Sequence, residues 1–426
     1  MRLRVAVIGA GAAGLCTARH ILARPETFRP PCVYELAQDV GGTWVYSERT
    51  GIGDHGLPVF SSMYQNMRTN LPKEVMAFPG FPFNPQLPSF VLHTDVLAYL
   101  DAYADHYNIR PQIKFETFVE LVKPAMKEKT GSGVTWEVTT LDLRKQDRTT
   151  EKFDAVIVCN GHYFQPSVPH ITGVDIFQGR VLHSHNYRRP EPFAGQSVVL
   201  LGASNSGQDI SLELAETARL VTLSHHGLPI ASPLPSNVHE ARVLKRMTEK
   251  TVIFEDESSV PADAVIFCTG YEYRFPFLST DVELRVHNGR VSPLYKHLVH
   301  MTFPSLIFIG ICQKICPFPH FDVQVRFALA VFANHVRLPS RKEMEAETIE
   351  EIEEKRASGV PDRHFHVMEE RQWSYHTSLL SLAGETPLPP VLEPLFQATK
   401  VFRKNDLLGY KNRSFRITGL DTWENN

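Results

Sequence analysis

A glycine-rich turn near the start of the chain constrains the fold more than any other sequence feature. The turn follows an apolar run that ends at Ile8 and opens a helical segment that reaches Leu22. In such a turn the first glycine allows the bend, the second lets the backbone approach a pyrophosphate, and the third lets helix and strand pack closely. Free N–H groups at the helix start then bind phosphate. The sequence thus predicts a dinucleotide-binding βαβ unit, with a turn formed by Gly9, Ala10, Gly11, Ala12, Ala13 and Gly14.

The residues after this turn indicate which dinucleotide the unit binds. Glu35 ends the next predicted strand, where a carboxylate can accept hydrogen bonds from ribose hydroxyls. Gly41 and Gly42 follow six to seven residues later, a spacing typical of FAD sites rather than NAD sites. We therefore expect FAD at this loop, with Gly42, Thr43 and Trp44 as further contacts.

A second glycine loop follows the apolar strand predicted at 197–201 and precedes a helix predicted at 208–218. Serine replaces the second glycine, and its hydroxyl can still donate to a phosphate. After the next strand stand Ser224 and His225, where an acid would select NAD, so we expect NADPH rather than NADH although no arginine is present. The cofactor contacts expected at this loop are Gly202, Ser204, Asn205, Ser206, Gly207, Gln208, Ser224 and His225.

Two further segments follow apolar strands and end in glycine. They are Asn160-Gly161 and Thr269-Gly270-Tyr271. A glycine there lets the chain turn beneath a nucleotide, and we count all five residues as cofactor contacts. An ordinary strand-to-loop turn is the alternative.

The order of these segments predicts an α/β fold with two Rossmann-like dinucleotide-binding domains. We expect the NADPH domain (190–290) to be inserted into the FAD domain, which then comprises residues 1–175 and 291–426 with C-terminal helices. Between the loops we expect an irregular excursion at 46–86, a helix at 94–107 and antiparallel strands at 113–153. Later helices are predicted at 323–336 and 341–356.

Composition excludes several classes of protein. The net charge of −3 among 426 residues gives no reason to expect a nucleic-acid partner. Six cysteines are too few for a disulfide scaffold, and we expect reduced, buried thiols. No apolar run has the length of a membrane span, and we find no metal-type spacing. We expect a cytoplasmic protein, although a signal peptide removed before this numbering would leave no trace and the protein would then be secreted. The sequence is compatible with a homo-oligomer.

Together these features resemble the flavin-containing monooxygenases over nearly the whole chain. The segment from Phe177 to Arg188 fits the family pattern F-x-G-x-x-x-H-x-x-x-Y-K/R, whereas Baeyer–Villiger enzymes carry Trp followed by Pro or Asp where this chain has Tyr187 and Arg188. Cys268-Thr-Gly-Tyr271 matches a second signature except at its cysteine. The run 63–83 resembles the insect members, which include enzymes that N-oxidise plant pyrrolizidine alkaloids.

The resemblance implies a mechanism. NADPH would reduce FAD, dioxygen would give a C4a-hydroperoxyflavin, and a soft nucleophile would attack it: a tertiary amine or alkaloid, or a sulfide. The segment Arg68–Lys73 resembles the one that places an asparagine beside the flavin, so we expect Thr69 as a contact and Asn70 as the catalytic residue, with a loop cap as the alternative role. Val119 resembles an adenine-side contact.

The same resemblance leaves some residues with structural or alternative roles. His183 and Tyr187 are expected to join the two domains rather than touch substrate. Gln324 either reaches the flavin pyrimidine edge or lies at a solvated helix start.

Three other functions compete with that of a flavin-containing monooxygenase. A Baeyer–Villiger monooxygenase is disfavoured by Tyr187-Arg188, and a flavin disulfide reductase by the lack of C-x-x-C or C-x-x-x-x-C spacing. A redox-sensing protein that binds FAD and NADPH without turnover is the rival from outside catalysis.

Overall fold

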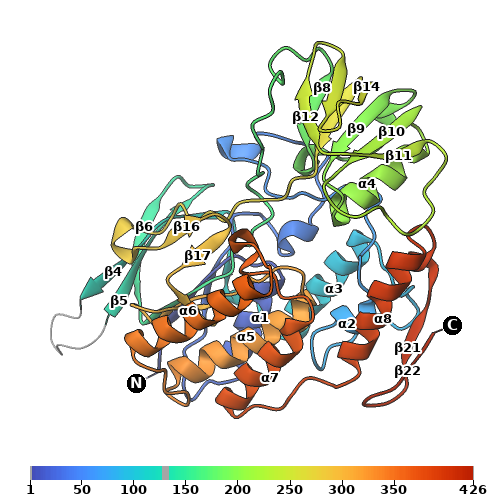
Figure 1. Cartoon of the computed structure of the whole chain (residues 1–426). Coiled ribbons are helices and arrows are strands. Elements are labelled where there is room, and N and C mark those ends of the chain that lie inside the picture. Colours follow the sequence, from blue (N-terminus) through green and yellow to red (C-terminus); the bar gives the residue numbers. More distant parts are fainter. Residues whose placement is uncertain (1, 127–133, 426) are drawn as a thin grey trace.

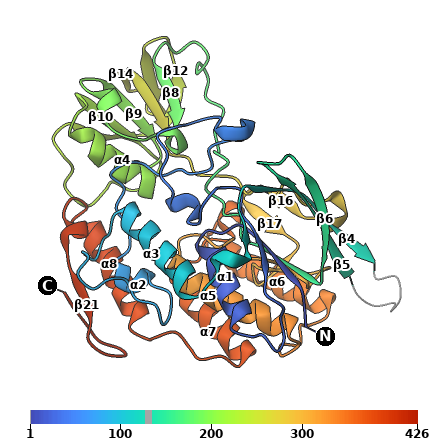
Figure 2. The ribbon, with the colours of Figure 1, turned by 180° about the vertical axis from the view of Figure 1, so that it is seen from behind.

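The computed structural model describes residues 2–126 and 134–425. It divides into two lobes, of which the larger contains both described termini (Figure 1, Figure 2). The larger lobe is built on a seven-stranded sheet with the order β18-β19-β20-β7-β1-β2-β3. From β20 to β3 the strands are parallel, while β18 and β19 are antiparallel. The bounds are β1 Val5–Ile8, β2 Cys32–Tyr34, β3 Ile113–Lys114, β7 Ala155–Val158, β18 Leu294–Tyr295, β19 Val299–His300 and β20 Leu306–Phe308.

The smaller lobe is built on a five-stranded parallel sheet with the order β11-β10-β9-β15-β8. All of its strands lie between β7 and β20, which are neighbours in the first sheet. The second sheet is therefore inserted into the first unit, as the sequence predicted. In each sheet the strand before the glycine loop is an interior strand: β1 lies between β7 and β2, and β9 lies between β15 and β10, as in Rossmann-type units. The bounds are β8 Arg180–His183, β9 Ser197–Leu201, β10 Leu220–Ser224, β11 Val238–Ala241 and β15 Ala264–Phe267.

Antiparallel strands complete the two lobes. The expected strands at 113–153 include a three-stranded meander, β4-β5-β6, and a second three-stranded sheet, β12-β13-β14, belongs to the second unit. Two hairpins lie late in the chain. The bounds are β4 Thr117–Met126, β5 Val134–Asp142, β6 Arg148–Phe153, β12 Leu244–Met247, β13 Thr251–Phe254, β14 Ser259–Pro261, β16 Arg285–His287, β17 Arg290–Ser292, β21 Phe415–Ile417 and β22 Trp423–Asn425.

Helices pack against both sheets. Helix α1 follows β1 and packs on α5, while α4 follows β9 and lies on the side of the smaller lobe that faces α8 (Figure 1). The bounds are α1 Ala12–Leu22, α2 Lys73–Met76, α3 His93–His106, α4 Asn205–Ala215, α5 Pro317–Phe332, α6 Arg341–Ala357, α7 Arg371–Ala383 and α8 Leu392–Asn405. The short 3₁₀ turns are η1 Gly42–Trp44, η2 Asp54–Gly56, η3 Arg110–Gln112, η4 Ser184–Asn186, η5 Glu191–Phe193, η6 Thr280–Val282, η7 Asp362–His364 and η8 Tyr410–Asn412. No helix of the described chain is long and apolar enough to cross a bilayer.

Two predicted helices were wrong in their bounds. The sequence placed one at 208–218, but α4 begins at Asn205 and ends at Ala215. The sequence placed a helix at 323–336, but α5 begins at Pro317 and ends at Phe332. Pro317 and Pro319 lie in the first turn of α5, where proline is tolerated because no N–H is needed there. The cysteines of the chain are all free, and only Cys32 is less than fully buried, as expected.

Candidate functional site

The two glycine loops have the same backbone geometry. Gly9 has φ +104° and Gly202 has φ +110°, both in the region that glycine adopts without strain. A Cβ on Gly9 would lie 2.5 Å from the carbonyl oxygen of Cys159, and a Cβ on Gly202 would lie 2.5 Å from that of Cys268. Each loop thus turns directly against the end of the neighbouring parallel strand. Only glycine fits at either position.

The third glycine of each loop lets the helix approach the turn. A Cβ on Gly14 would lie 1.8 Å from the Gly9 carbonyl oxygen, and one on Gly207 would lie 1.8 Å from that of Gly202. Helices α1 and α4 begin here, with N-caps at Gly11 and Ser204. Neither helix is capped by a side chain or has an acidic residue in its first turn. Their N–H groups are therefore open to an anion.

The first loop faces the Gly-Gly pair. The N–H of Gly41 donates to the carbonyl oxygen of Ala10 at 3.2 Å, and Gly42, in the left-handed region, lies against the Cα of Gly11. Two bare Cα atoms thus line one side of the loop, and no side chain blocks the helix start. Ala12 and Ala13 are buried in α1, while Thr43 and Trp44 continue the wall in η1. These residues fit a bound pyrophosphate.

Glu35 lies directly beside this loop. Its Oε2 accepts from the N–H of Ala10 at 2.6 Å, and its Oε1 accepts from the N–H of Ala37 at 2.8 Å. Burial raises the pKa of the Glu35 carboxyl, and the N–H groups of Ala37 and Ala10 oppose that rise. Each oxygen retains a lone pair for a ribose hydroxyl. Because Glu35 bonds backbone to backbone with Thr117, the strand β4 brings buried Val119 to the same side.

The second loop has a histidine in the place of Glu35. The N–H of Gly9 donates to the carbonyl oxygen of Tyr34, and the N–H of Gly202 donates to that of Ser224, both at 2.8 Å. His225 therefore matches Glu35, and its Nε2 lies 2.8 Å from Glu240 Oε1. The sequence also proposed Ser224 as a cofactor contact, but the structure shows this side chain fully buried.

The Ser224 hydroxyl is used inside the protein. It donates to the carbonyl oxygen of Arg242 and accepts from the N–H of Leu244, both at 2.8 Å. A side chain that alternates inward along the strand cannot reach a ligand outside it. Ser224 is the last residue of β10 and His225 follows it. His225 stays a predicted contact of the 2′-phosphate.

The strand ends predicted to turn beneath each dinucleotide are adjacent to the loops. Asn160 follows Cys159 beside Gly9, and its Nδ2 donates to the carbonyl oxygen of Arg274 at 3.0 Å. Thr269 follows Cys268 beside Gly202, and its Oγ1 donates to the carbonyl oxygen of Ser167 at 2.5 Å. Both segments thus connect the two units while lying under their loops. The glycines that follow, Gly161 and Gly270, have φ +68° and +83°.

Tyr271 lies at the junction of these connections. Its ring contacts those of Tyr163, His183 and His185 at centroid distances of 5.5, 5.2 and 5.9 Å. Burial raises the pKa of the Tyr271 phenol to about 12, so it is a neutral hydroxyl at physiological pH.

Asn70 lies between the two units. Its neighbour Thr69 is buried and pairs with Val91 through the Thr69 N–H and through Oγ1, which accepts from the Val91 N–H. The Asn70 Oδ1 accepts from the Tyr410 hydroxyl at 3.4 Å. Lys411 Nζ donates to the Arg68 carbonyl oxygen at 3.2 Å and contacts Asp209 of α4 at 2.8 Å. Asn70 is thus held beside the helix of the second loop.

The family signature joins the irregular excursion to the second unit. The guanidinium of Arg188 is buried, and its hydrogen bonds go only to backbone carbonyl oxygens. Three of these carbonyl oxygens belong to the excursion: Ser47, Arg49 and Ser61. The other two belong to the signature itself: His185 and Tyr187. The Tyr187 hydroxyl donates to Glu213 of α4 at 2.8 Å. This bond lies within the second unit, and the Tyr187 ring contacts Tyr64 of the excursion at a centroid distance of 5.6 Å. The interdomain role expected for Tyr187 stays a prediction.

Gln324 does not lie at a solvated helix start, while its contact with the flavin stays a prediction. It lies in the second turn of α5, with a fully buried side chain, so the solvated helix start is wrong. Its Oε1 accepts from the N–H of Gly310 at 3.0 Å, and its Nε2 donates to the Tyr375 hydroxyl at 2.9 Å. The amide thus ties α5 to the end of β20 and to α7.

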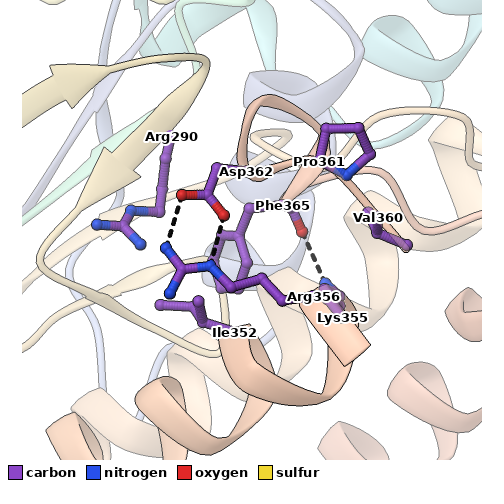
Figure 3. Close-up of a pocket in the computed structure, with 8 residues that line it drawn as sticks. All are labelled: Arg290, Ile352, Lys355, Arg356, Val360, Pro361, Asp362 and Phe365. Carbon is purple, nitrogen blue, oxygen red and sulfur yellow. Dashed lines mark hydrogen bonds and ion pairs between the residues drawn. The ribbon is translucent and has the colours of Figure 1, made fainter. Parts of the chain in front are cut away.

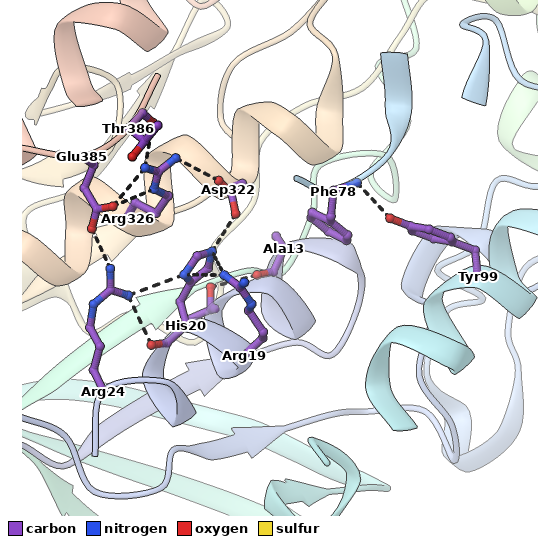
Figure 4. Close-up of polar contacts among 11 residues, drawn as sticks. Ala13, Arg19, His20, Arg24, Phe78, Tyr99, Asp322, Arg326, Glu385 and Thr386 are labelled. Atoms are coloured by element: carbon purple, nitrogen blue, oxygen red, sulfur yellow. Dashed lines mark hydrogen bonds and ion pairs between the residues drawn. The ribbon is translucent and has the colours of Figure 1, made fainter. Parts of the chain in front are cut away.

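Helix α1 is fixed to α5 by a buried polar cluster (Figure 4). His20 Nε2 lies 2.6 Å from Asp322 Oδ1, and Arg326 lies 3.5 Å from the second oxygen of Asp322. Cys16 adds a third group that could ligate a metal, within 4.8 Å. Because Arg19 also contacts His20 (Figure 4), cationic side chains surround the group and oppose a metal cation. We assign the cluster to helix anchoring.

Two hollows on the helical side lie away from the glycine loops. One, of about 10 Å³, has room for about a single water molecule. It is lined by the Arg356–Asp362 ion pair and by Lys355, which donates to the carbonyl oxygen of Phe365 (Figure 3). The other, of about 390 Å³, lies beside Tyr295 and Leu382. Neither is lined by a predicted site residue.

Known proteins that resemble this chain share its family and its fold. The family model described as flavin-binding monooxygenase-like matches residues 2–232 and 231–425. This chain belongs to that family. The flavin-containing monooxygenase FMO GS-OX-like 4 of Arabidopsis thaliana is 35% identical over 441 residues, covering 99% of this chain and 94% of the plant protein.

Two solved structures of this family's fold cover nearly the whole chain. The S-allyl-L-cysteine S-oxygenase from Allium sativum is 34% identical, with a TM-score of 0.87 over 97% of this chain and 96% of its own. Tmm from Pelagibacter sp. strain HTCC7211 is 28% identical, with a TM-score of 0.86 over 99% and 95%.

Membership of the flavin-binding monooxygenase-like family identifies the chain as a flavin monooxygenase that uses FAD and NADPH. The open helix starts and glycine cradles described above fit these two dinucleotides. Sequence reasoning missed Tyr410 and Lys411, which close over Asn70 from the last fifth of the chain. No local motif marks them, since only the tertiary fold brings them to Asn70.

Proposed function

We propose that this flavin monooxygenase transfers one oxygen atom from O₂ to the sulfur of a small thioether. The observation that supports the substrate class is the likeness to the Allium sativum S-oxygenase, which extends over nearly all of both chains. A thioether sulfur is a soft nucleophile and needs no activation by a protein base.

The residues of this chain have separate tasks in that reaction. The loop at 9–14 with Glu35 holds FAD, and the loop at 202–207 with His225 holds NADPH. When bound, reduced flavin supplies the electrons that activate dioxygen. Asn70 is held by Tyr410 through Oδ1. No hydrogen bond among the described residues uses its Nδ2, which we assign to the flavin. Arg188 holds the excursion in place through its hydrogen bonds to Ser47, Arg49 and Ser61.

N-oxygenation of tertiary amines or alkaloids is the alternative from the sequence. It shares the cofactors and the requirement for a soft nucleophile, and the resemblance of residues 63–83 to insect members is what favours it. The proteins compared above are from plants and a bacterium, so this finer assignment stays a prediction.

A matched substrate panel tests the proposal. The purified FAD-loaded enzyme is given NADPH and O₂ with S-allyl-L-cysteine, S-methyl-L-cysteine or a tertiary amine, and products are identified by mass. We expect sulfoxide formation and substrate-dependent NADPH oxidation with the thioethers. N-oxide from the amine without any sulfoxide would contradict the proposal and favour the alternative.

A further inference from the structure

The C-terminal helix α8 places an arginine against the second glycine loop. Arg403 donates from Nη1 to Asn205 Oδ1 and from Nη2 to Gln208 Oε1, the latter at 2.7 Å. Both partners lie in the first turn of α4, and both were expected from the sequence to contact NADPH. Almost two hundred residues separate Arg403 from them. Its guanidinium is thus brought to the loop by the fold alone.

Positive side chains lie at the N-terminus of α4, where a positive charge destabilises a helix. In the described chain Arg403 has no carboxylate within ion-pair distance, and its acceptors are neutral amides. Lys411 lies close by with Asp209 as its partner, and its pKa is lowered by burial and further by Arg403 and Arg68. A cation at a helix N-terminus is unfavourable because that end is already positive. An anion bound there would remove the conflict.

The guanidinium of Arg403 has donors left with which to bind that anion. An arginine side chain has five N–H donors in a planar fork, and the amides use two of them. The ring of Tyr410 supports the group, with the guanidinium carbon 5.8 Å from its centroid. Asn205 and Gln208 therefore fix the orientation of Arg403 while leaving donors for phosphate oxygens.

We propose that Arg403 is a ligand of the NADPH pyrophosphate, delivered from the C-terminal helix to the loop at 202–207. The pyrophosphate is the expected group because the loop glycines approach this part of a dinucleotide. His225, on the other side of the loop, faces the 2′-phosphate instead. The C-terminal helix then forms one wall of the dinucleotide site.

The test measures equilibrium binding to the FAD-loaded protein in the absence of substrate. NADP⁺ and NAD⁺ are titrated by calorimetry into the unchanged protein, Arg403→Gln, Arg403→Lys and the control Lys404→Gln, whose exposed side chain lies next along α8. FAD content and thermal midpoint are recorded for each variant. These values separate a loss of binding from a loss of folding.

We expect Arg403→Gln to raise the Kd of both NADP⁺ and NAD⁺ by about 10- to 100-fold, about 1.4–2.8 kcal/mol. Arg403→Lys should raise both Kd values less, and Lys404→Gln should leave them unchanged. A lower thermal midpoint with Kd values within twofold would overturn the proposal, because Arg403 would then only tie α8 to α4. Weakening of NADP⁺ alone would also overturn it by moving the contact to the 2′-phosphate. If Arg403→Gln does not fold, an unchanged Kd in Arg403→Lys decides against the proposal, and a raised Kd for both nucleotides supports it.

Discussion

Replacing Arg188 by methionine should release the excursion that follows the first glycine loop. Methionine retains the apolar stem but leaves the carbonyl oxygens of Ser47, Arg49 and Ser61 without their donor. Burial lowers the pKa of Arg188, as expected for a cation surrounded by carbonyl dipoles rather than carboxylates. Its contribution is therefore made through hydrogen bonds and not through an ion pair.

The magnitude follows from those contacts. A hydrogen bond to a charged group contributes about 1.5–3 kcal/mol. Neighbouring contributions do not add fully, and freed carbonyls near the surface regain water. We therefore expect a loss of about 3–5 kcal/mol in the free energy of local opening, less than the sum of the three lost hydrogen bonds. At 1.4 kcal/mol per tenfold, this corresponds to roughly 10²- to 4 × 10³-fold more frequent opening.

Hydrogen exchange followed by mass spectrometry measures that opening. The reporters are the amides of Gly53 and Val59, which donate to Leu57 and Gly51 within the excursion. Arg189→Met is the matched control, because its half-exposed side chain makes only a 4.0 Å contact with Glu191. Equal exchange in the two variants would refute the role of Arg188. Faster exchange across the whole chain would show that the loss is global and not confined to the excursion.

Three further predictions concern the loops, the catalytic asparagine and pH. Gly207→Ala should abolish NADP⁺ binding while FAD is retained, and Gly14→Ala should abolish FAD binding, because each added Cβ would lie 1.8 Å from a carbonyl oxygen. Calorimetry measures NADP⁺ binding and flavin absorbance measures FAD content. Loss of FAD from Gly207→Ala would contradict separate sites for the two cofactors. Asn70→Ala should uncouple NADPH oxidation from product and release hydrogen peroxide, with exposed Gln65→Ala as the control; unchanged coupling would remove Asn70 from the chemistry. Burial lowers the pKa of His183 and His300 to about 4, so the unfolded chain binds protons below about pH 6.5 that the folded chain does not. The free energy of unfolding should therefore fall between about pH 6.5 and 4, by about 1.4 kcal/mol per pH unit for each such histidine, and a flat profile in urea titrations over this range would contradict the prediction.

The sequence predicted the parts of the fold that local physics determines. Both glycine loops, their strands and the insertion of one sheet into the other follow from apolar runs that end in glycine, and the structure confirms them. The bounds of the domains stay predictions. The helix at 317–332 was misplaced because Pro317 and Pro319 break a periodicity pattern without breaking a helix start.

The candidate site was predictable only where one segment determines its own geometry. Glu35 could be placed by its spacing from Gly14, whereas Ser224 and His225 could not be told apart until the strand register showed which one points inward. The contacts of Tyr410 with Asn70 and of Arg403 with Asn205 join segments hundreds of residues apart. Such contacts depend on packing across the whole chain and leave no spacing to recognise.

The central claim is that this enzyme places an oxygen atom from O₂ on a thioether sulfur. Turnover of S-allyl-L-cysteine with NADPH under ¹⁸O₂ tests it directly, with the sulfoxide analysed by mass spectrometry. We expect one labelled oxygen in each sulfoxide and one NADPH consumed for each labelled product. NADPH oxidation with no labelled sulfoxide from any thioether, or a sulfoxide oxygen derived from water, would contradict it.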